Sequence, residues 1–227
     1  MNQQDMSKRL AGRAAAELVQ DGMQIGLGTG STIFFTIERL VERMRTQGLR
    51  TACIPTSEQS RQLAEDGGIP ILTFAQTTVL DLVIDGADEI DPQLSLIKGG
   101  GGALLREKLV ALAGKRFIIV ADNSKQVETL GHFPLPVEIV PFGHEGTLRR
   151  LQEQGAFPEL RMDGYAPYVT DNGNYIARCH FGRIENPAAL HDSLKRVSGV
   201  VETGLFVGMT EQAILSNGVD VWSVSGR

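Results

Sequence analysis

Four short segments carry residue types that can bind an anion or move a proton, and each follows an apolar run that predicts a β-strand. The first combines glycines with hydroxyl side chains, the second gathers carboxylates, the third joins one lysine to four glycines, and the fourth ends in a lysine. They are residues 26–32 (GLGTGST), 85–91 (DGADEID), 98–102 (KGGGG) and 122–125 (DNSK). Ligands of open α/β sheets bind beyond the carboxyl ends of the strands, so these segments are the candidates for a functional site.

The glycine-rich segment predicts a phosphate-binding loop. Its glycines let backbone N–H groups converge on an anion, the helix that follows adds positive potential, and Thr29, Ser31 and Thr32 supply hydroxyl donors. A tight turn with Ser31 or Thr32 as the helix cap is the alternative. A dinucleotide loop is disfavoured because Ser31 replaces the third glycine of G-x-G-x-x-G, and a nucleoside-triphosphate loop because the segment has no lysine.

The acidic segment follows the buried strand expected at residues 79–84. Sites form where such strands end, so Asp85 and Asp88 are stronger candidates than Glu89 or Asp91. A solvated acidic loop is the alternative reading. A divalent-metal site is disfavoured, because the spacing is not that of a calcium loop and no histidine lies nearby.

Lys98 and its glycines predict a cradle for a small anion with a mobile point charge. The helix expected at residues 103–113 is apolar except for Arg106, Glu107 and Lys108, which together cover roughly 200° of its circumference. Apolar residues lie one turn before and one turn after Glu107, so its carboxylate should be partly removed from water. The alternative is a glutamate that simply pairs with Arg106 or Lys108.

Lys125 closes the fourth segment and could reach a site at the same edge of the sheet. The local sequence is equally consistent with a lysine that is simply exposed to solvent. Ser124 or Asn123 can cap a helix at this position.

The elements that must position these residues alternate between strand and helix, which predicts a mainly parallel sheet covered on both faces. After a first helix closed by Asp21-Gly22, strands are expected at residues 23–27, 52–55, 79–84, 94–97 and 117–121, and helices at 33–44, 57–65 and 103–113. From about Gly131 the expected order is β-α-β-β-α-β, typical of a ferredoxin-like unit, with residues 168–170 and 175–179 forming a hairpin around residues 171–174. Residues 212–224 are expected to return to the first sheet. The fold class is therefore α/β with a smaller α+β domain.

Composition excludes several classes of protein. The 227 residues are 42% hydrophobic and 22% charged, as in ordinary globular proteins, and the net charge of −5 disfavours nucleic-acid binding by bulk electrostatics. No apolar run is long enough to span a membrane, and the N-terminus lacks the apolar core of a signal peptide. Cys53 and Cys179 are predicted to be buried free thiols, and we expect a cytoplasmic protein.

Six motifs, in this order, closely resemble the ribose-5-phosphate isomerases of type A. They are G-L-G-T-G-S-T (26–32), P-T-S-E-Q-S (55–60), D-G-A-D-E-I-D (85–91), K-G-G-G-G-A-L-L-R-E-K (98–108), A-D-N-S-K-Q-V (121–127) and F-P-L-P-V-E (133–138). The match runs from about Lys8 to the end of the chain and departs at His132, commonly lysine in the family, and at Gly102, often alanine. The resemblance implies a Rossmann-like catalytic domain (residues 1–130 and 206–227) with a small α+β domain (131–205) inserted before its last strands.

The resemblance also implies an activity. The reaction is the interconversion of D-ribose 5-phosphate and D-ribulose 5-phosphate in the non-oxidative pentose phosphate pathway, without a metal or organic cofactor, by a homodimer or homotetramer. Glu107 matches the general base, and Lys98, Asp85 and Asp88 match residues of ring opening and oxyanion stabilisation. The implied substrate-binding residues are Thr29, Gly30, Ser31, Thr32, Asp85, Gly86, Ala87, Asp88, Lys98, Gly99, Gly100, Gly101 and Lys125.

Two alternatives of other classes stay open. One is a non-catalytic sugar-phosphate-sensing domain, which the presence of Glu107 and Lys98 disfavours. The other is an enzyme like the coenzyme A transferases, whose glycine and acid motifs fit this sequence poorly.

Overall fold

The computed structural model describes residues 2–226 and divides into two units. Unit 1 comprises Met1–Ala87, Arg106–Lys125 and Met209–Arg227, and unit 2 comprises Asp88–Leu105 and Gln126–Gly208. Each unit has its own sheet and its own hydrophobic core, and each is described by itself.

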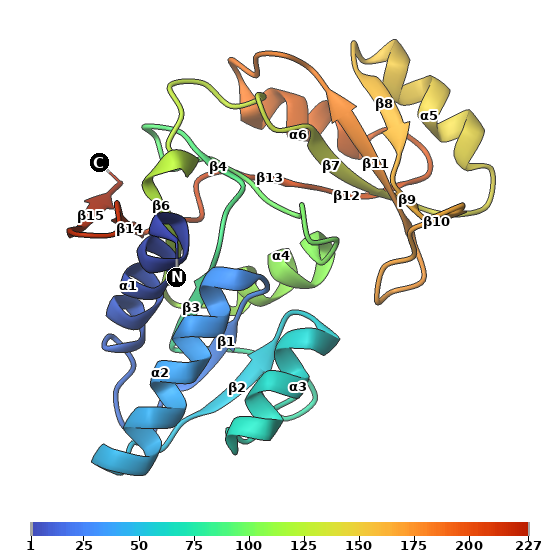
Figure 1. Ribbon diagram of the computed structural model, residues 1–227. Helices are drawn as coiled ribbons and strands as arrows, with labels where there is room; N and C mark the ends of the chain where they lie inside the picture. Colours follow the sequence, from blue (N-terminus) through green and yellow to red (C-terminus); the bar gives the residue numbers. More distant parts are fainter. Residues whose placement is uncertain (1, 227) are drawn as a thin grey trace. The chain divides into compact units, whose positions relative to one another are not determined.

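Unit 1 is built on a six-stranded sheet of order β15-β14-β6-β3-β1-β2 (Figure 1). Its strands are β1 (Gln24–Leu27), β2 (Ala52–Pro55), β3 (Leu82–Asp85), β6 (Phe117–Asp122), β14 (Gln212–Ser216) and β15 (Val221–Ser225). Strands β1, β2, β3, β6 and β14 pair in parallel with their neighbours, and β15 pairs antiparallel with β14 at the edge of the sheet. The predicted parallel sheet and the return of the C-terminal residues to it are both confirmed.

The helices of unit 1 begin and end at recognisable signals. They are α1 (Gln3–Ala16), α2 (Ser31–Gln47), α3 (Glu58–Gly67), α4 (Leu104–Ala113), whose first two residues belong to unit 2, and the 3-10 turn η1 (Asn123–Lys125). Ser57 caps α3 by accepting from the backbone of Ser60, and α2 stops at Gly48, whose φ of 70° suits glycine. The first helix ends before the predicted Asp21-Gly22 stop, because Leu18 and Val19 turn back onto Ala15 and Ala16.

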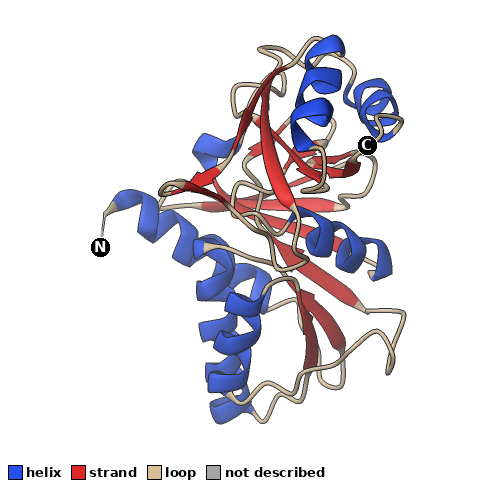
Figure 2. Ribbon diagram, turned by 90° about the vertical axis from the view of Figure 1, so that its right-hand side faces the viewer, coloured by secondary structure: helices blue, strands red, loops and turns tan. Residues whose placement is uncertain are grey.

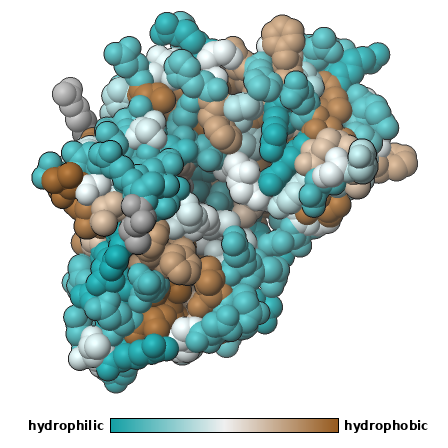
Figure 3. All heavy atoms as spheres, viewed as in Figure 1, coloured by the Kyte–Doolittle hydropathy of each residue, from teal (hydrophilic) through white to brown (hydrophobic). Residues whose placement is uncertain are grey.

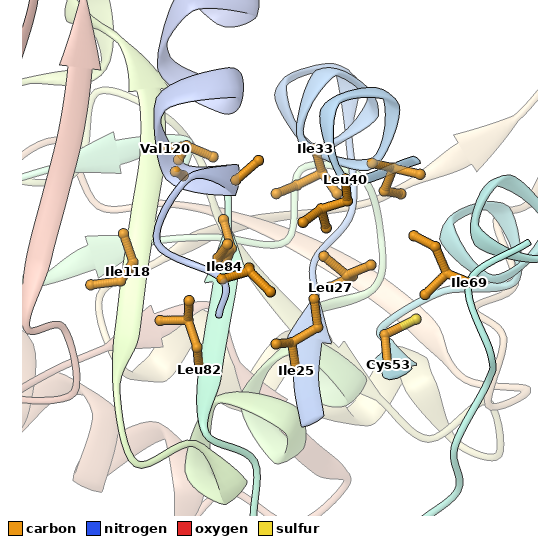
Figure 4. Packing of buried hydrophobic residues seen from close by; sticks show 14 of the residues in the cluster. Ile25, Leu27, Ile33, Leu40, Cys53, Ile69, Leu82, Ile84, Ile118 and Val120 are labelled. Atoms are coloured by element: carbon orange, nitrogen blue, oxygen red, sulfur yellow. The ribbon is translucent and has the colours of Figure 1, made fainter. Parts of the chain in front are cut away.

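The two faces of this sheet are covered by different helices, as the alternation of side chains along a strand requires. Ile25 and Leu27 of β1 point into a core that α1 and α2 close (Figure 4). Gly26 points the other way, where a Cβ would overlap Val110 of α4. Helix α4 therefore packs closely on the second face, directly over β1.

Helix α2 and its neighbour α3 also carry apolar side chains at the surface (Figure 3, lower part of the view). Phe34, Ile37, Val41 and Leu63 line a shallow groove of about 590 Å³ with a rim of charged residues. These two helices therefore leave part of their apolar surface uncovered by the rest of unit 1.

Unit 2 has a four-stranded antiparallel sheet of order β12-β7-β11-β8, with two helices beside it (Figure 2, upper part of the view). Its elements are β7 (Leu135–Ile139), α5 (His144–Glu153), β8 (Phe157–Leu160), β11 (Tyr175–His180), α6 (Pro187–Lys195) and β12 (Val200–Thr203), with a small ribbon of β9 (Met162–Asp163) and β10 (Ala166–Pro167). The order of the larger elements is the predicted β-α-β-β-α-β. The ferredoxin-like expectation is confirmed.

Two predictions about strands are wrong. Residues 94–97 do not join the parallel sheet: β5 (Leu96–Ile97) pairs antiparallel with β4 (Glu89–Ile90) and with β13 (Leu205–Phe206) in a separate sheet of unit 2. Because both partners of β5 lie in unit 2, residues 88–105 join that unit, whereas the expected division placed them in residues 1–130.

The expected hairpin is also wrong. The turn forms, with Gly173 donating to the Thr170 carbonyl, but β11 pairs with β7 and β8 and not with residues 168–170. The Thr170 hydroxyl instead donates to Glu138 Oε1 3.0 Å away, and the Tyr168 backbone bonds to Arg161. These bonds hold residues 168–170 away from a ladder with β11.

None of the helices within residues 2–226 combines the length and apolar character that crossing a bilayer requires.

Both cysteines are buried free thiols, as the sequence predicts, and burial raises the pKa of Cys53 and of Cys179 to about 12. The thiolate is the reactive form, so neither residue should react with a thiol reagent such as dithionitrobenzoate in native protein at pH 8. Unfolding in guanidinium should release two reactive thiols per chain. Rapid reaction of one thiol in the native state would contradict this burial.

Candidate active site

The residues of the predicted site fall in both units, and each group is described within its own unit. In unit 1 they gather where the strand order changes direction, because β1 has β2 on one side and β3 on the other. Leu27 lies opposite Ile84 in the register, and Gly28 N–H donates to the Ile84 carbonyl at 2.9 Å. The loops that follow β1 and β3 therefore start side by side, at the kind of switch point where α/β sheets bind ligands.

Asp85 is the last residue of β3 and is fully buried. Its Oδ1 accepts hydrogen bonds from the backbone N–H of Thr29 at 3.1 Å and of Gly86 at 2.7 Å. A Cβ on Gly28 would overlap this carboxylate, so only glycine lets the two loops approach so closely. The carboxylate of Asp85 thus holds the glycine-rich loop against the end of the neighbouring strand.

The glycine-rich loop leads directly into α2. Its cap residue is Gly30, with a φ of 108°, and this cap makes no side-chain hydrogen bond to the helix. The alternative of a turn capped by Ser31 or Thr32 is therefore wrong, because both residues lie inside the first turn. A helix N-terminus without a side-chain cap presents N–H groups and positive potential to an anion.

Hydroxyl groups that the sequence analysis did not single out support this loop. Thr56 is buried, and its Oγ1 lies 2.7 Å from Oγ1 of Thr29. Ser60 Oγ donates to the Gly28 carbonyl at 2.6 Å and lies 3.0 Å from the hydroxyl of Ser57. The signal in the sequence was the hydroxyl-rich run directly after β2.

Glu107 lies in the first turn of α4, and it is only 5% exposed. The C-terminal end of α4 bonds to Leu80, just before β3 begins, so the helix runs antiparallel to the strands. Val110 packs at Gly26, and Glu107 lies one turn closer to the carboxyl ends of the strands. The prediction that Glu107 is removed from water is confirmed.

Helix α4 departs from an ordinary surface helix, because it buries two charged side chains and exposes two leucines. Lys108 is buried beside Glu107, while Leu109 and Leu112 are exposed, Leu112 to 67%. Arg106 Nη1 bonds to Glu58 Oε1 of α3 at 2.8 Å. The sequence places two charged side chains where apolar ones would be expected, and this supports a functional role for that face.

Lys125 ends η1, directly after β6, and is half-buried. Neither Ser124 nor Asn123 is the capping acceptor that the sequence suggested. Asp122 takes this role, because its Oδ1 accepts from both the backbone and the hydroxyl of Ser124. The lysine therefore follows a strand end in the same sheet as Asp85.

In unit 2, Asp88 and Lys98 flank the small sheet of β4, β5 and β13. Asp88 N–H donates to the Ile97 carbonyl, and Asp88 Oδ2 accepts from Gly100 N–H, both at 2.8 Å. Asp88 thereby orders the glycines that follow Lys98. The loop containing Gly99, Gly100 and Gly101 is therefore tied to the acidic segment within one unit.

Lys98 is only 2% exposed, so the expectation of a mobile point charge is wrong. Its backbone N–H donates to the Gly204 carbonyl at 2.9 Å, and its Nζ lies 5.4 Å from the centre of the Phe206 ring. A Cβ on Gly204 would overlap the Lys98 carbonyl, so this close strand approach needs glycine. A buried ammonium acts more strongly on nearby charge than one in water.

The alternative prediction of a solvated acidic loop is also wrong, because Asp85, Glu89 and Asp91 are all buried. Glu89, ranked low from the sequence, accepts from the backbone N–H groups of Gly131 at 2.7 Å and of Phe133 at 2.5 Å. The Phe133 ring in turn lies against Gly100. Glu89 is thus a positioning residue for the wall of the glycine loop.

Within residues 2–226, no group of three or more histidine, cysteine, aspartate or glutamate side chains is arranged to hold a metal ion.

Comparison with known proteins identifies the family. The family model described as ribose 5-phosphate isomerase A (phosphoriboisomerase A) matches residues 52–219. The chain belongs to the ribose 5-phosphate isomerase A family. The ribose-5-phosphate isomerase A of Bacillus mycoides is 51% identical over 215 residues, which are 93% of this chain and 97% of that protein. The enzyme of the same name from Gloeobacter violaceus is 50% identical, over 97% of each chain.

Solved structures of ribose 5-phosphate isomerases share this fold over nearly the whole chain. The ribose 5-phosphate isomerase from Plasmodium falciparum has a TM-score of 0.94 at 37% identity, covering 98% of this chain and 99% of that one. A D-ribose-5-phosphate isomerase in complex with phospho-erythronic acid also has a TM-score of 0.94, at 35% identity, covering 99% and 100%. The family assignment therefore rests on sequence and on structure.

The contact between Gly28 and Asp85 gives a test of the site in this member of the ribose 5-phosphate isomerase A family. Gly28→Ala should lower the free energy of unfolding by about 1–3 kcal/mol, because its methyl group needs the space of a buried carboxylate. Gly86→Ala is the matched control, since a Cβ there meets no atom closer than 3.8 Å. Urea unfolding of both variants measures the difference. Equal stability of the two would show that Asp85 is not held against the glycine loop.

Proposed function

We propose that this protein interconverts D-ribose 5-phosphate and D-ribulose 5-phosphate through an enediolate, with Glu107 as the general base. The observation that carries the proposal is a buried glutamate on α4, one turn from the residue that packs over β1, in a chain of the ribose 5-phosphate isomerase A family. The relative that binds phospho-erythronic acid supports a phosphorylated sugar acid or sugar as the type of ligand.

The phosphate group would bind at the start of α2. Gly30 leaves the first N–H groups of the helix without a side-chain cap, and Thr29, Ser31 and Thr32 offer hydroxyl donors beside them. Lys125 would add a positive charge. Binding energy from this remote group orients the reacting carbons and need not take part in the chemistry itself.

Opening of the furanose ring requires one proton to leave the C1 hydroxyl and one to reach the ring oxygen. We assign this exchange to Asp85 and Asp88, which end and follow β3. The backbone N–H groups of Thr29 and Gly86 hold the Asp85 carboxylate in a fixed orientation. Gly86 and Ala87, the two residues between the aspartates, would line the sugar.

In the isomerisation step, Glu107 takes the proton from C2 of the open-chain aldose and returns it to C1. A second proton passes from the C2 hydroxyl to the C1 oxygen, so that the C1 aldehyde becomes a hydroxyl and C2 becomes the ketone. A positioned carboxylate typically contributes about 10²–10⁴-fold to such a transfer. Burial of Glu107 removes solvent that would otherwise compete with the substrate for its carboxylate.

Negative charge develops on the carbonyl oxygen as the enediolate forms. Lys98 is suited to stabilise it, because a buried ammonium is held in place before the reaction and is not screened by solvent. The N–H groups of Gly99 and Gly101 would assist, while that of Gly100 is already bonded to Asp88.

The two alternatives fit less well. The curated relatives match nearly the whole chain and are named as isomerases, which favours an enzyme over a sensing domain. The same relatives disfavour an enzyme like the coenzyme A transferases. A homodimer or homotetramer in the cytoplasm, implied by the resemblance, stays a prediction.

The role of Glu107 is tested by Glu107→Gln. We expect kcat for ketose formation from ribose 5-phosphate to fall by about 10²–10⁴-fold, because the amide cannot accept the C2 proton. Substrate affinity, measured by calorimetry, should change little. Glu65→Gln on the exposed side of α3 is the control and should keep full activity. Substantial turnover in Glu107→Gln would refute the assignment of the base.

Lys98→Ala tests stabilisation of the oxyanion. A group that acts mainly on the transition state lowers kcat, whereas a group that only binds substrate raises KM. We expect a fall in kcat of about 10²–10³-fold, the size seen when a single oxyanion donor is removed. Because Lys98 is buried, circular dichroism must first show that the variant is folded. An effect confined to KM would make Lys98 a binding residue alone.

A further inference from the structure

Unit 2 contains a cavity of about 190 Å³ that is bordered by Gly99 and Gly100 of the predicted site, and whose other lining residues have no part in the proposed reaction. It lies on the face of the four-stranded sheet opposite α5 and α6. Ala177 and Cys179 of β11 pack into the core with those helices, while Ile176 and Arg178 alternate to the other face and line the cavity. We propose that this cavity is a second binding site, for a small oxyanion, phosphate or carboxylate, carried on a short apolar body.

The first cationic wall of the cavity is Arg161, which follows β8. Its Nη1 donates to the Gly100 carbonyl at 3.3 Å, and its guanidinium lies 3.7 Å from the centre of the Tyr168 ring. The Tyr168 hydroxyl donates to the Gly101 carbonyl at 3.3 Å. These contacts fix the plane of the guanidinium and leave donors of its fork available for an anion.

The second cationic wall is Arg178. In the register its neighbours are Pro136 on β7 and Glu159 on β8, and the Glu159 carboxylate lies 3.9 Å from His180 Nε2. Within residues 2–226, neither Arg178 nor Arg161 forms an ion pair with a carboxylate. The cavity thus brings together two guanidinium groups that lack an ion pair with a carboxylate of the described residues, and Asp163 acts on Arg161 only through a charge interaction without a hydrogen bond.

The two arginines influence each other. Burial lowers the pKa of the Arg161 guanidinium, and the positive charge of Arg178 lowers it further. Both groups remain charged at neutral pH. The like charges of Arg161 and Arg178 repel, and an oxyanion placed between them replaces this repulsion with two charge-assisted interactions.

The rest of the lining limits the size and character of the ligand. Phe133, Pro134, Pro136 and Ile176 form an apolar wall, so the carbon body next to the anion should be short and largely hydrophobic. The volume is below the roughly 300–1,000 Å³ of pockets for drug-sized molecules, which points to a small metabolite.

Gly100 links this cavity to the loop after Lys98. Its carbonyl accepts from Arg161, its N–H donates to Asp88, and its backbone lines the cavity. An anion bound by Arg161 therefore contacts a side chain that is itself hydrogen-bonded to Gly100, the glycine that also bonds to Asp88. Binding itself does not depend on the isomerase activity, so the two proposals fail independently.

Titration of the full-length protein with inorganic phosphate and, separately, with butyrate tests the site. The side-chain Nε–Hε signals of Arg161 and Arg178 in ¹⁵N-resolved spectra report on the cavity alone. With at least one of the two anions, we expect both signals to shift saturably. Arg178→Gln should weaken binding about tenfold or more, read at Arg161, because one of the two charge-assisted interactions is lost. Saturable shifts with phosphate assign the site to phosphorylated ligands, and saturable shifts with butyrate assign it to carboxylates.

Arg149→Gln is the matched control, since Arg149 is an exposed arginine of α5 in the same unit, paired with Glu153. It should leave both anion titrations unchanged. The proposal is overturned by the absence of a saturable shift below about 20 mM of either anion, or by equal affinity in Arg178→Gln and the wild type. Since Arg178 is exposed on β11, the variant should fold, and an unchanged backbone spectrum checks this.

Discussion

The buried carboxylate of Asp85 accepts backbone hydrogen bonds from Thr29 and Gly86 at the point where two parallel strands end together. This contact requires glycine at position 28, because a Cβ there would overlap the Asp85 carboxylate. The glycine-rich loop is thus held by a charge that also belongs to the chemistry. Any change in the position of Asp85 would move the loop that leads into α2.

Charged groups removed from water recur throughout the proposed site. Asp85, Glu107 and Lys98 are each at most 5% exposed, although burying a charge costs free energy unless hydrogen bonds or opposite charges offset it. On α4 this is combined with leucines that face solvent, the reverse of the pattern that would stabilise a surface helix. A fold that keeps such an arrangement gives up stability for reactive groups that are already desolvated and oriented.

Unit 2 contributes its residues through short strands. β4, β5 and β13 together comprise six residues, yet the antiparallel pairing of β4 with β5 places Asp88 and the buried Lys98 at the same end of the sheet. Glu89 fixes the backbone at Gly131 and Phe133, and Phe133 lies against Gly100. Phe133 therefore packs against the glycine loop, and two arginines without an ion pair among the described residues line the cavity beside it.

The sequence by itself determined the elements whose signals are local. The period of apolar residues in α2 and the buried runs of β1, β2 and β6 depend on residues close together in the chain, and these elements were predicted correctly. The burial of Glu107 was also foreseeable, because three consecutive charges cannot all lie on one solvent-facing stripe of a helix.

Only the tertiary structure decided which strands pair and which charges lose contact with water. β5 is outside the parallel sheet because it pairs with β4, just before it in the chain, and with β13, which comes from the far end of unit 2 and which the local sequence does not indicate. Lys98, Glu89 and Asp91 are charged residues that the tertiary structure nevertheless buries. The two arginines of the second cavity are distant in sequence, Arg161 directly after β8 and Arg178 on β11, so the pairing of β8 with β11 was needed to bring them together.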